Sequence, residues 1–258
     1  MSSNVEALSR QPSISLAGRR FDNVFFSAMA VLIVATVFVG FAHSYYLAGM
    51  FSAPLPSPIV HIHGAVFSCW ILLFITQICL VSAGRVDIHR RLGIAGFLLA
   101  CLMVVLGVLV GTDQLVRNSA DPAGGFKFQY ANFLYIIPLT DTLIFATLIF
   151  FAFRARFNPA AHKRLILIAT ITLAGAGIGR WPVAFLHTPT LFSALILLAI
   201  HFSYVLPIVG YDLWSMRKIQ RATLWGSAFF ISLEVIKIPI GFSSAWNAFA
   251  AWALSVAR

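Results

Sequence analysis

Four ionisable side chains lie deep inside apolar segments that are long enough to cross a membrane. They are Asp141, His201, Glu234 and Lys237. A charged group in the hydrocarbon core is costly, so an ionisable residue there is by default a functional candidate. Asp141 and His201 lie about nine and eleven residues along segments that enter from the same side, which at 1.5 Å per residue places both roughly 14 to 17 Å deep. We expect them to face each other near the midplane.

A transport role is one hypothesis for these residues. Glu234 and Lys237 are one helical turn apart, so their opposite charges can neutralise each other locally. Alternatively they join a polar path beside residues that break helices, as in proton-coupled or small-solute transporters. The path would contain Asp141, Arg180, His201, Glu234 and Lys237, with Pro138, Pro207 and Pro239 near it.

The histidines divide by their depth in the apolar segments. Those near the outer ends are His43, His61, His63 and His187, whereas His89 and His162 lie at the inner surface and His201 within a segment. Two imidazoles from neighbouring helices can ligate haem iron axially inside a membrane bundle. One outer pair drawn from His43, His61, His63 and His201, together with the inner pair His89 and His162, would give a two-haem electron path. Redox work linked to haem b or to quinone is therefore the leading hypothesis.

A zinc or copper site at the outer face is a further alternative. Its ligands would be His43, His61 and His63 with Asp113 or His201. The sequence has no HExxH motif and no two histidines at i and i+4, the spacing that places two ligands on one helix face. The metal assignment therefore stays unknown.

A non-catalytic membrane scaffold or accessory subunit is the remaining hypothesis. Gln77, His61 and His63 would then form hydrogen bonds between helices, and Asp141 would pair with Arg180 or His201. The sequence contains no Gly-rich phosphate loop, no nucleophile box and no paired carboxylates at working separation, which argues against a soluble-type enzyme. Whether the chain is an enzyme stays open.

The segments that must position these residues follow from composition. Of the 258 residues, 60% are hydrophobic and 10% charged, with a mean hydropathy of +0.91, whereas a soluble domain has roughly 25% charged residues. Segments of about 20 apolar residues predict an all-α bundle of seven transmembrane helices. They span residues 24–47, 58–82, 92–112, 132–153, 164–179, 190–214 and 224–240. We expect residues 1–21 to form a cytoplasmic segment, residues 22–258 one membrane domain, and residues 243–256 an outer interfacial helix anchored by Trp246 and Trp252.

The basic residues predict the orientation of the chain. The sequence has 18 Lys and Arg against 8 Asp and Glu, for a net charge of +10. Most of them flank the segments on one side, and these are Arg10, Arg19, Arg20, Arg85, Arg90, Arg91, Arg154, Arg156, Lys163, Arg164, Arg217, Lys218 and Arg221. The positive-inside rule places this side and the N-terminus in the cytoplasm. Anionic lipid, and not nucleic acid, is the partner that the charge implies.

Several short boxes resemble uncharacterised multi-pass proteins of the bacterial inner membrane. They are FAHSYYLAG (41–49), HIHGAVF (61–67), GRVDIHRRLG (84–93) and AHKRL (161–165). The resemblance implies a bacterial plasma-membrane location and adds no catalytic assignment. A looser similarity to two-haem cytochrome b bundles rests on histidines at both faces, with separations that depart from that pattern. The partners expected are the lipid bilayer, a quinone or membrane redox partner, and further copies of this chain in a homo-oligomer.

Overall fold

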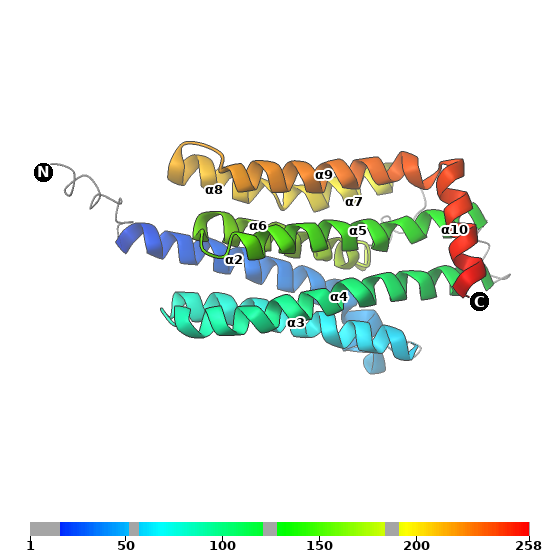
Figure 1. The fold of residues 1–258 in the computed structure, drawn as a ribbon, viewed down its shortest axis with the longest axis horizontal. Helices are drawn as coiled ribbons and strands as arrows, with labels where there is room; N and C mark the ends of the chain where they lie inside the picture. Colours follow the sequence, from blue (N-terminus) through cyan, green and yellow to red (C-terminus); the bar gives the residue numbers. More distant parts are fainter. Residues whose placement is uncertain (1–15, 52–56, 121–127, 184–190, 258) are drawn as a thin grey trace, which may run out of the picture.

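The computed structural model describes residues 16–51, 57–120, 128–183 and 191–257. Within these ranges the chain is an all-α helix bundle without strands, and seven helices are long and apolar enough to cross a membrane. The fold predicted from the sequence is therefore confirmed. Figure 1 shows the long helices side by side, with a last helix lying across one end of the bundle.

The long helices correspond closely to the predicted segments. They are α2 (Leu16–Phe41, continued by a π-helical turn Ala42–Tyr46), α3 (Pro58–Ser82), α4 (Val86–Ala120), α5 (Phe128–Arg154), α6 (Pro159–Ile178), α7 (Leu191–Ser203) with α8 (Leu206–Met216), and α9 (Arg221–Gly241). The sequence accounts for several of their ends. Pro159 occupies the first turn of α6, and the Asn158 side chain caps that helix by accepting from the Ala161 backbone N–H. Gly84, with φ of +75°, makes the turn between α3 and α4.

Helix α6 forms the centre of the bundle, in contact with α2, α5, α7 and α9. Ile168, Ala169 and Ile171 are fully inaccessible, so α6 has neighbours around most of its circumference. The glycines of this helix allow the close contact that membrane bundles use. A Cβ on Gly40 of α2 would lie 2.2 Å from the Gly177 carbonyl oxygen, so the two backbones touch at this crossing.

The sixth predicted segment is broken into α7 and α8. Pro207 has no N–H to donate to the Ser203 carbonyl one turn before it, which interrupts the helix there. The break is held in place by Tyr204, whose hydroxyl is hydrogen bonded to Thr36 of α2. The two halves therefore meet within the bundle.

Two further features lie at the end of the bundle opposite the N-terminus. Helix α4 continues eight residues beyond the predicted end at Thr112, because Asp113 and Arg117 form an i,i+4 ion pair (2.9 Å) and Leu115 is buried. Residues Ser244–Ala257 form a separate helix, α10, that packs over α4 and α5 (Figure 1). Helix α10 begins three residues after the end of α9 at Gly241, and the interfacial position of residues 243–256 stays a prediction.

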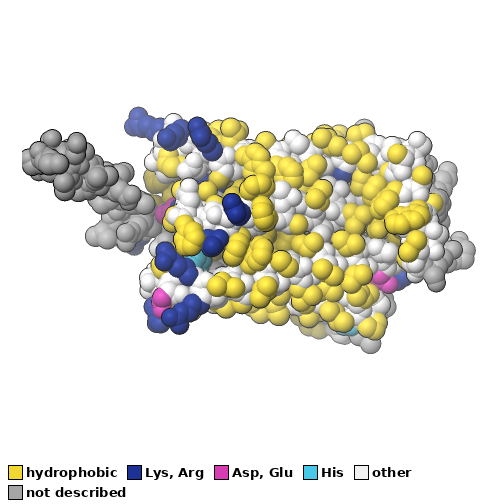
Figure 2. All heavy atoms as spheres, in the orientation of Figure 1, with side chains coloured by type: hydrophobic (Ala, Val, Ile, Leu, Met, Phe, Trp, Pro, Cys, Tyr) yellow, Lys and Arg dark blue, Asp and Glu magenta, His cyan; other side chains and the backbone are white. Residues whose placement is uncertain are grey.

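The basic side chains gather at one end of the bundle, which we call the basic end (Figure 2). The described residues that flank the helices there are Arg85, Arg90, Arg91, Arg154, Arg156, Arg217, Lys218 and Arg221. The lateral surface between the two ends carries exposed apolar side chains such as Val31, Leu98 and Leu195, which suits contact with lipid.

Candidate functional site

The four ionisable residues singled out by the sequence meet in one buried cluster, which we call the charged cluster. It consists of Asp141 from α5, His201 from α7, and Glu234 and Lys237 from α9. Lys237 Nζ donates to Glu234 Oε1 (2.8 Å) and to Asp141 Oδ1 (3.2 Å). His201 Nδ1 lies 3.8 Å from Glu234 Oε2. One ammonium group is therefore shared by two carboxylates, and the imidazole faces one of them.

The charged cluster is closed off from its surroundings. The side chains of Glu234 and His201 are 3% and 6% exposed, and those of Lys237 and Asp141 are 9% and 17% exposed. Phe230 is fully buried and sets its ring edge-to-face against His201, with the ring centroids 4.8 Å apart. Charges in such a site interact strongly because little water screens them.

The backbone of α6 fixes the orientation of His201. Its Nε2 lies 2.9 Å from the Ile171 carbonyl oxygen, which can only accept, so Nε2 carries a hydrogen. The remaining nitrogen, Nδ1, is the one that faces Glu234. The ring reaches Ile171 because residue 175, one turn further along α6, is glycine: a Cβ there would lie 2.5 Å from His201 Cε1.

The expected partners of Asp141 are partly different in the structure. Its ion pair is formed with Lys237 rather than with Arg180 or His201. Arg180 instead donates to the Ala176 carbonyl (2.8 Å) and lies over the Phe41 ring. In its described contacts Arg180 thus stays apart from the charged cluster, because it lies beyond the end of α6 and turns back onto that helix.

A second buried ion pair, near the basic end, escaped the sequence analysis. Arg164 of α6 donates through Nε to Asp212 Oδ1 of α8 (2.8 Å), and the two side chains are 2% and 0% exposed. Asp212 Oδ2 accepts from Thr223 Oγ1 (2.6 Å) and from the Gln220 backbone N–H (3.0 Å). The signal was Asp212 itself, an acid inside the sixth apolar segment, whereas Arg164 was counted only as a flanking basic residue.

A half-buried ion pair lies beside this one. Lys163 of α6 is bonded to both carboxylate oxygens of Asp22 on α2, and Tyr211 of α8 donates to Asp22 Oδ1 (2.7 Å). Together the two networks tie α2, α6, α8 and α9 to one another at the basic end.

The outer histidines do not join the charged cluster in their described contacts. His43 lies against Phe51, His61 against Tyr45, and His63 against Phe67 with ring centroids 4.0 Å apart. His187 lies outside the described residues. Among the residues that the structure describes, no group of three or more His, Cys, Asp or Glu is placed to hold a metal ion.

The inner histidines, in contrast, are neighbours. The His89 and His162 rings, at the starts of α4 and α6, have centroids 6.2 Å apart and are nearly perpendicular. His162 Nδ1 donates to the Ala152 carbonyl (2.8 Å), which leaves Nε2 without a hydrogen when the ring is neutral. With its amide oriented to satisfy both neighbours, Gln77 donates to His89 Nδ1 (2.7 Å) and accepts from the Gly93 N–H.

The charged cluster therefore has the composition of a proton-binding site, and the inner histidine pair places the hydrogen-free Nε2 of a neutral His162 on a ring that neighbours His89. No family model matches this sequence, and no curated protein or solved structure matches the chain.

Proposed function

We propose that this chain is a proton-coupled membrane transporter whose proton is bound in the charged cluster. The observation that carries the proposal is the sharing of Lys237 by Asp141 and Glu234, with His201 Nδ1 facing the same glutamate. Chains of acidic and histidine side chains inside a bundle are the usual proton relays of pumps and transporters.

The charges of the cluster give it room for one proton. Two carboxylates and one ammonium group leave a net charge of −1 when His201 is neutral. An uncompensated charge in a bundle interior is costly, so one added proton, on a carboxyl group or on His201 Nδ1, restores neutrality. The cluster therefore alternates between a protonated, neutral state and a deprotonated state with a net charge of −1. A cationic substrate would neutralise the deprotonated state.

The helices that carry the cluster also contain places where a helix can bend. Pro138 precedes Asp141 by three residues in α5, Pro239 follows Lys237 by two in α9, and the break between α7 and α8 follows His201 by a few residues. Broken and proline-containing helices are the elements that move in many transporters. Movement at these positions would expose the cluster to one side at a time.

The ion pairs at the basic end support a closed state on that side. Arg164 with Asp212, and Lys163 with Asp22, connect α2, α6 and α8 below the cluster. Separating these helices requires both pairs to part. We infer that the two networks form the gate of the basic end.

Infrared difference spectroscopy on purified protein tests the proton site directly. A pH titration is expected to change the carboxyl C=O absorption by one group per chain, and the change should disappear in Asp141→Asn. In proteoliposomes loaded with a pH-sensitive dye, a potassium diffusion potential should drive proton uptake that Asp141→Asn abolishes.

Asp113→Asn is the matched control, since Asp113 pairs with Arg117 on the surface of α4 and should leave both signals unchanged. Proton movement that is equal in the wild type and in Asp141→Asn would contradict a coupled role for the cluster. Absence of any titrating group in the cluster, whether carboxyl or imidazole, would reduce the cluster to a structural element.

Haem-linked redox work is the second candidate function, and the proximity of His89 and His162 favours it. The bond that His162 Nδ1 donates to the Ala152 carbonyl is of the kind that orients a metal-binding imidazole. His201 suits an outer haem less well, because its Nε2 is bonded to Ile171 and its Nδ1 faces Glu234. His162 would supply one axial ligand through Nε2, and His89 would supply the other once its Nδ1 carries the hydrogen in place of accepting from Gln77.

Titration of the purified protein with haemin tests this candidate. A Soret band that shifts on reduction is expected, and it should be lost in His89→Ala and in His162→Ala but kept in His43→Ala. A preparation that stays colourless after haemin treatment would contradict it.

We propose the bacterial inner membrane as the location, with the basic end in the cytoplasm. The gathering of Arg and Lys at one end of the bundle supports this orientation through the positive-inside rule. The choice of membrane rests on the resemblance of the short boxes to uncharacterised bacterial inner-membrane proteins.

A further inference from the structure

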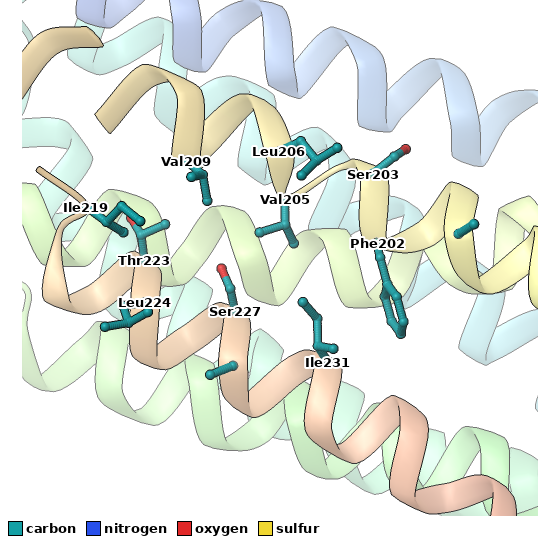
Figure 3. Close-up of a pocket in the computed structure, with 12 residues that line it drawn as sticks. Phe202, Ser203, Val205, Leu206, Val209, Ile219, Thr223, Leu224, Ser227 and Ile231 are labelled. Carbon is teal, nitrogen blue, oxygen red and sulfur yellow. The ribbon is translucent and has the colours of Figure 1, made fainter. Parts of the chain in front are cut away.

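A groove on the side of the bundle lies between α9 and the broken pair α7 and α8. It has a volume of about 440 Å³ and is lined almost entirely by apolar side chains (Figure 3). Leu206 and Leu224 on its rim are 67% and 61% exposed, so the groove opens onto the lateral, lipid-facing surface. Its size falls within the roughly 300 to 1,000 Å³ of small-molecule sites.

One polar group in this groove has no partner. Ser227 is 7% exposed, and its hydroxyl oxygen is buried without a hydrogen bond. Figure 3 shows the hydroxyl turned from α9 toward α8, across the groove. The neighbouring Thr223 hydroxyl is not available, because it donates to Asp212.

Many hydroxyls in this bundle do have a partner. Eight helical Ser and Thr side chains donate to the carbonyl one turn back, namely Thr36, Ser68, Thr76, Thr112, Thr147, Thr170, Thr172 and Ser215. Besides Ser227, Ser57 and Ser119 also have buried hydroxyl oxygens without a partner among the described residues, but neither lines the groove. Ser227 has no such bond. A buried donor left unpaired is destabilising, and an acceptor atom on a ligand would remove that cost.

The depth of Ser227 limits the kind of ligand. It lies six residues into α9, roughly 9 Å along the helix from Arg221 at the basic end. If Arg221 lies at the membrane interface, Ser227 lies inside the hydrocarbon core, which is about 30 Å thick. That position is deeper than the phosphate and ester groups of the lipids. The acceptor must therefore belong to a molecule that dissolves in the hydrocarbon core itself.

We propose that the groove binds an uncharged, bilayer-soluble carbonyl compound with an alkyl or isoprenoid tail, whose carbonyl oxygen accepts a hydrogen bond from Ser227. The ligand enters sideways from the membrane past Leu206 and Leu224. Phe230, fully buried beside both His201 and Phe202, separates the groove from the charged cluster. The site is thus distinct from the proton site, and it stands whether or not the chain transports protons.

Photolabelling in proteoliposomes tests the proposal. The probe is a long-chain methyl ketone with a diazirine in its chain, and the reference is the corresponding hydrocarbon without the carbonyl. The ketone should label residues 199–231, and decylubiquinone should compete with it. Ser227→Ala is expected to weaken ketone labelling by about 3- to 10-fold while leaving hydrocarbon labelling unchanged.

Two further variants complete the test. Ala228→Leu fills the groove from the lipid side and should abolish labelling by both probes, whereas Ser215→Ala removes a hydroxyl that already has a partner and should change nothing. Equal ketone labelling in the wild type and Ser227→Ala would overturn the proposal. So would labelling spread evenly over the helices, or a groove protected from both probes in a dimer of this chain.

Discussion

At the scale of single residues, the buried charges bear on both the stability of the bundle and the proposed proton binding. Lys237 is the only cation within 4 Å of Asp141 and Glu234 among the described ion pairs. Removing one partner of a buried pair leaves an uncompensated charge, while removing all of them together is often tolerated. Comparing single and combined variants therefore separates the effect of the buried charges on stability from their proposed role in proton uptake.

Lys237→Met is therefore expected to destabilise the protein by roughly 3 to 5 kcal/mol, since two carboxylates lose their shared cation. The combined variant Asp141→Asn, Glu234→Gln, Lys237→Met should recover most of that loss and still fail to take up protons. Unfolding in a denaturing detergent, monitored through the loss of helicity, measures the change in stability. The dye assay measures the change in proton uptake. Proton uptake retained in the combined variant would place the function elsewhere.

Arg164→Met should cost a similar roughly 3 to 5 kcal/mol, because Asp212 would stay buried with only Thr223 and Gln220 as partners. Arg156→Met is the control, since Arg156 is exposed and its loss should change stability by no more than about 0.5 kcal/mol. The same unfolding measurement applies. Equal stability of the two variants would mean that the buried pair adds nothing beyond a surface residue.

Sequence reasoning at this scale worked where depth along a helix was enough. Asp141 and His201 were expected to share a depth, and they belong to one cluster. The contact between Asp141 and Lys237 was not predicted, because it depends on how α5 and α9 pack. Asp212 was missed because its position close to the polar end of a segment resembles that of an ordinary interfacial residue.

At the scale of helices, a glycine of α6 determines the geometry of the charged cluster. The His201 ring occupies the space that a Cβ at residue 175 would need. Small residues in membrane helices thus provide room for a functional side chain as well as for a neighbouring backbone.

Gly175→Ala should push the His201 ring away from the Ile171 carbonyl and cost about 1 to 3 kcal/mol through overpacking. Proton uptake should fall with it. Gly179→Ala is the matched control on the same helix, because its Cβ would meet its nearest neighbour at an ordinary 3.6 Å. Stability and proton uptake that are the same in both variants would show that the ring has room to move.

The boundaries of the helices were predictable to different degrees. Proline and asparagine at the start of α6 are local signals that act within one turn. The continuation of α4 beyond Thr112 depends on burial of Leu115 against α10, which lies more than a hundred residues later in the chain. Contacts at that sequence separation leave no periodic pattern to detect.

At the scale of the whole molecule, the asymmetry of charge predicts how the bundle sits in the membrane. The test requires a chain without Cys69, Cys79 and Cys101 and with one new cysteine. Lys218→Cys at the basic end should be protected from an impermeant maleimide in intact cells, whereas Ser255→Cys in α10 should react, because the two lie at opposite ends of the bundle. Both should react after the cells are opened. The reverse pattern in intact cells would invert the proposed orientation.

The central place of α6 also has a consequence for biogenesis. Helices α6 and α9 have the lowest hydropathy of the seven candidate spans, and both carry charges whose partners lie on other helices. Arg164 finds Asp212 only after 48 further residues of the chain have been made. If the translocon released each helix singly into lipid, Arg164 would be left without its partner in the membrane. We therefore expect α6 to stay at the translocon, or beside other helices, until α8 has been synthesised. The bundle is thus completed late, because α6, the fifth of the seven candidate spans, reaches its final place only when its later partners have been made.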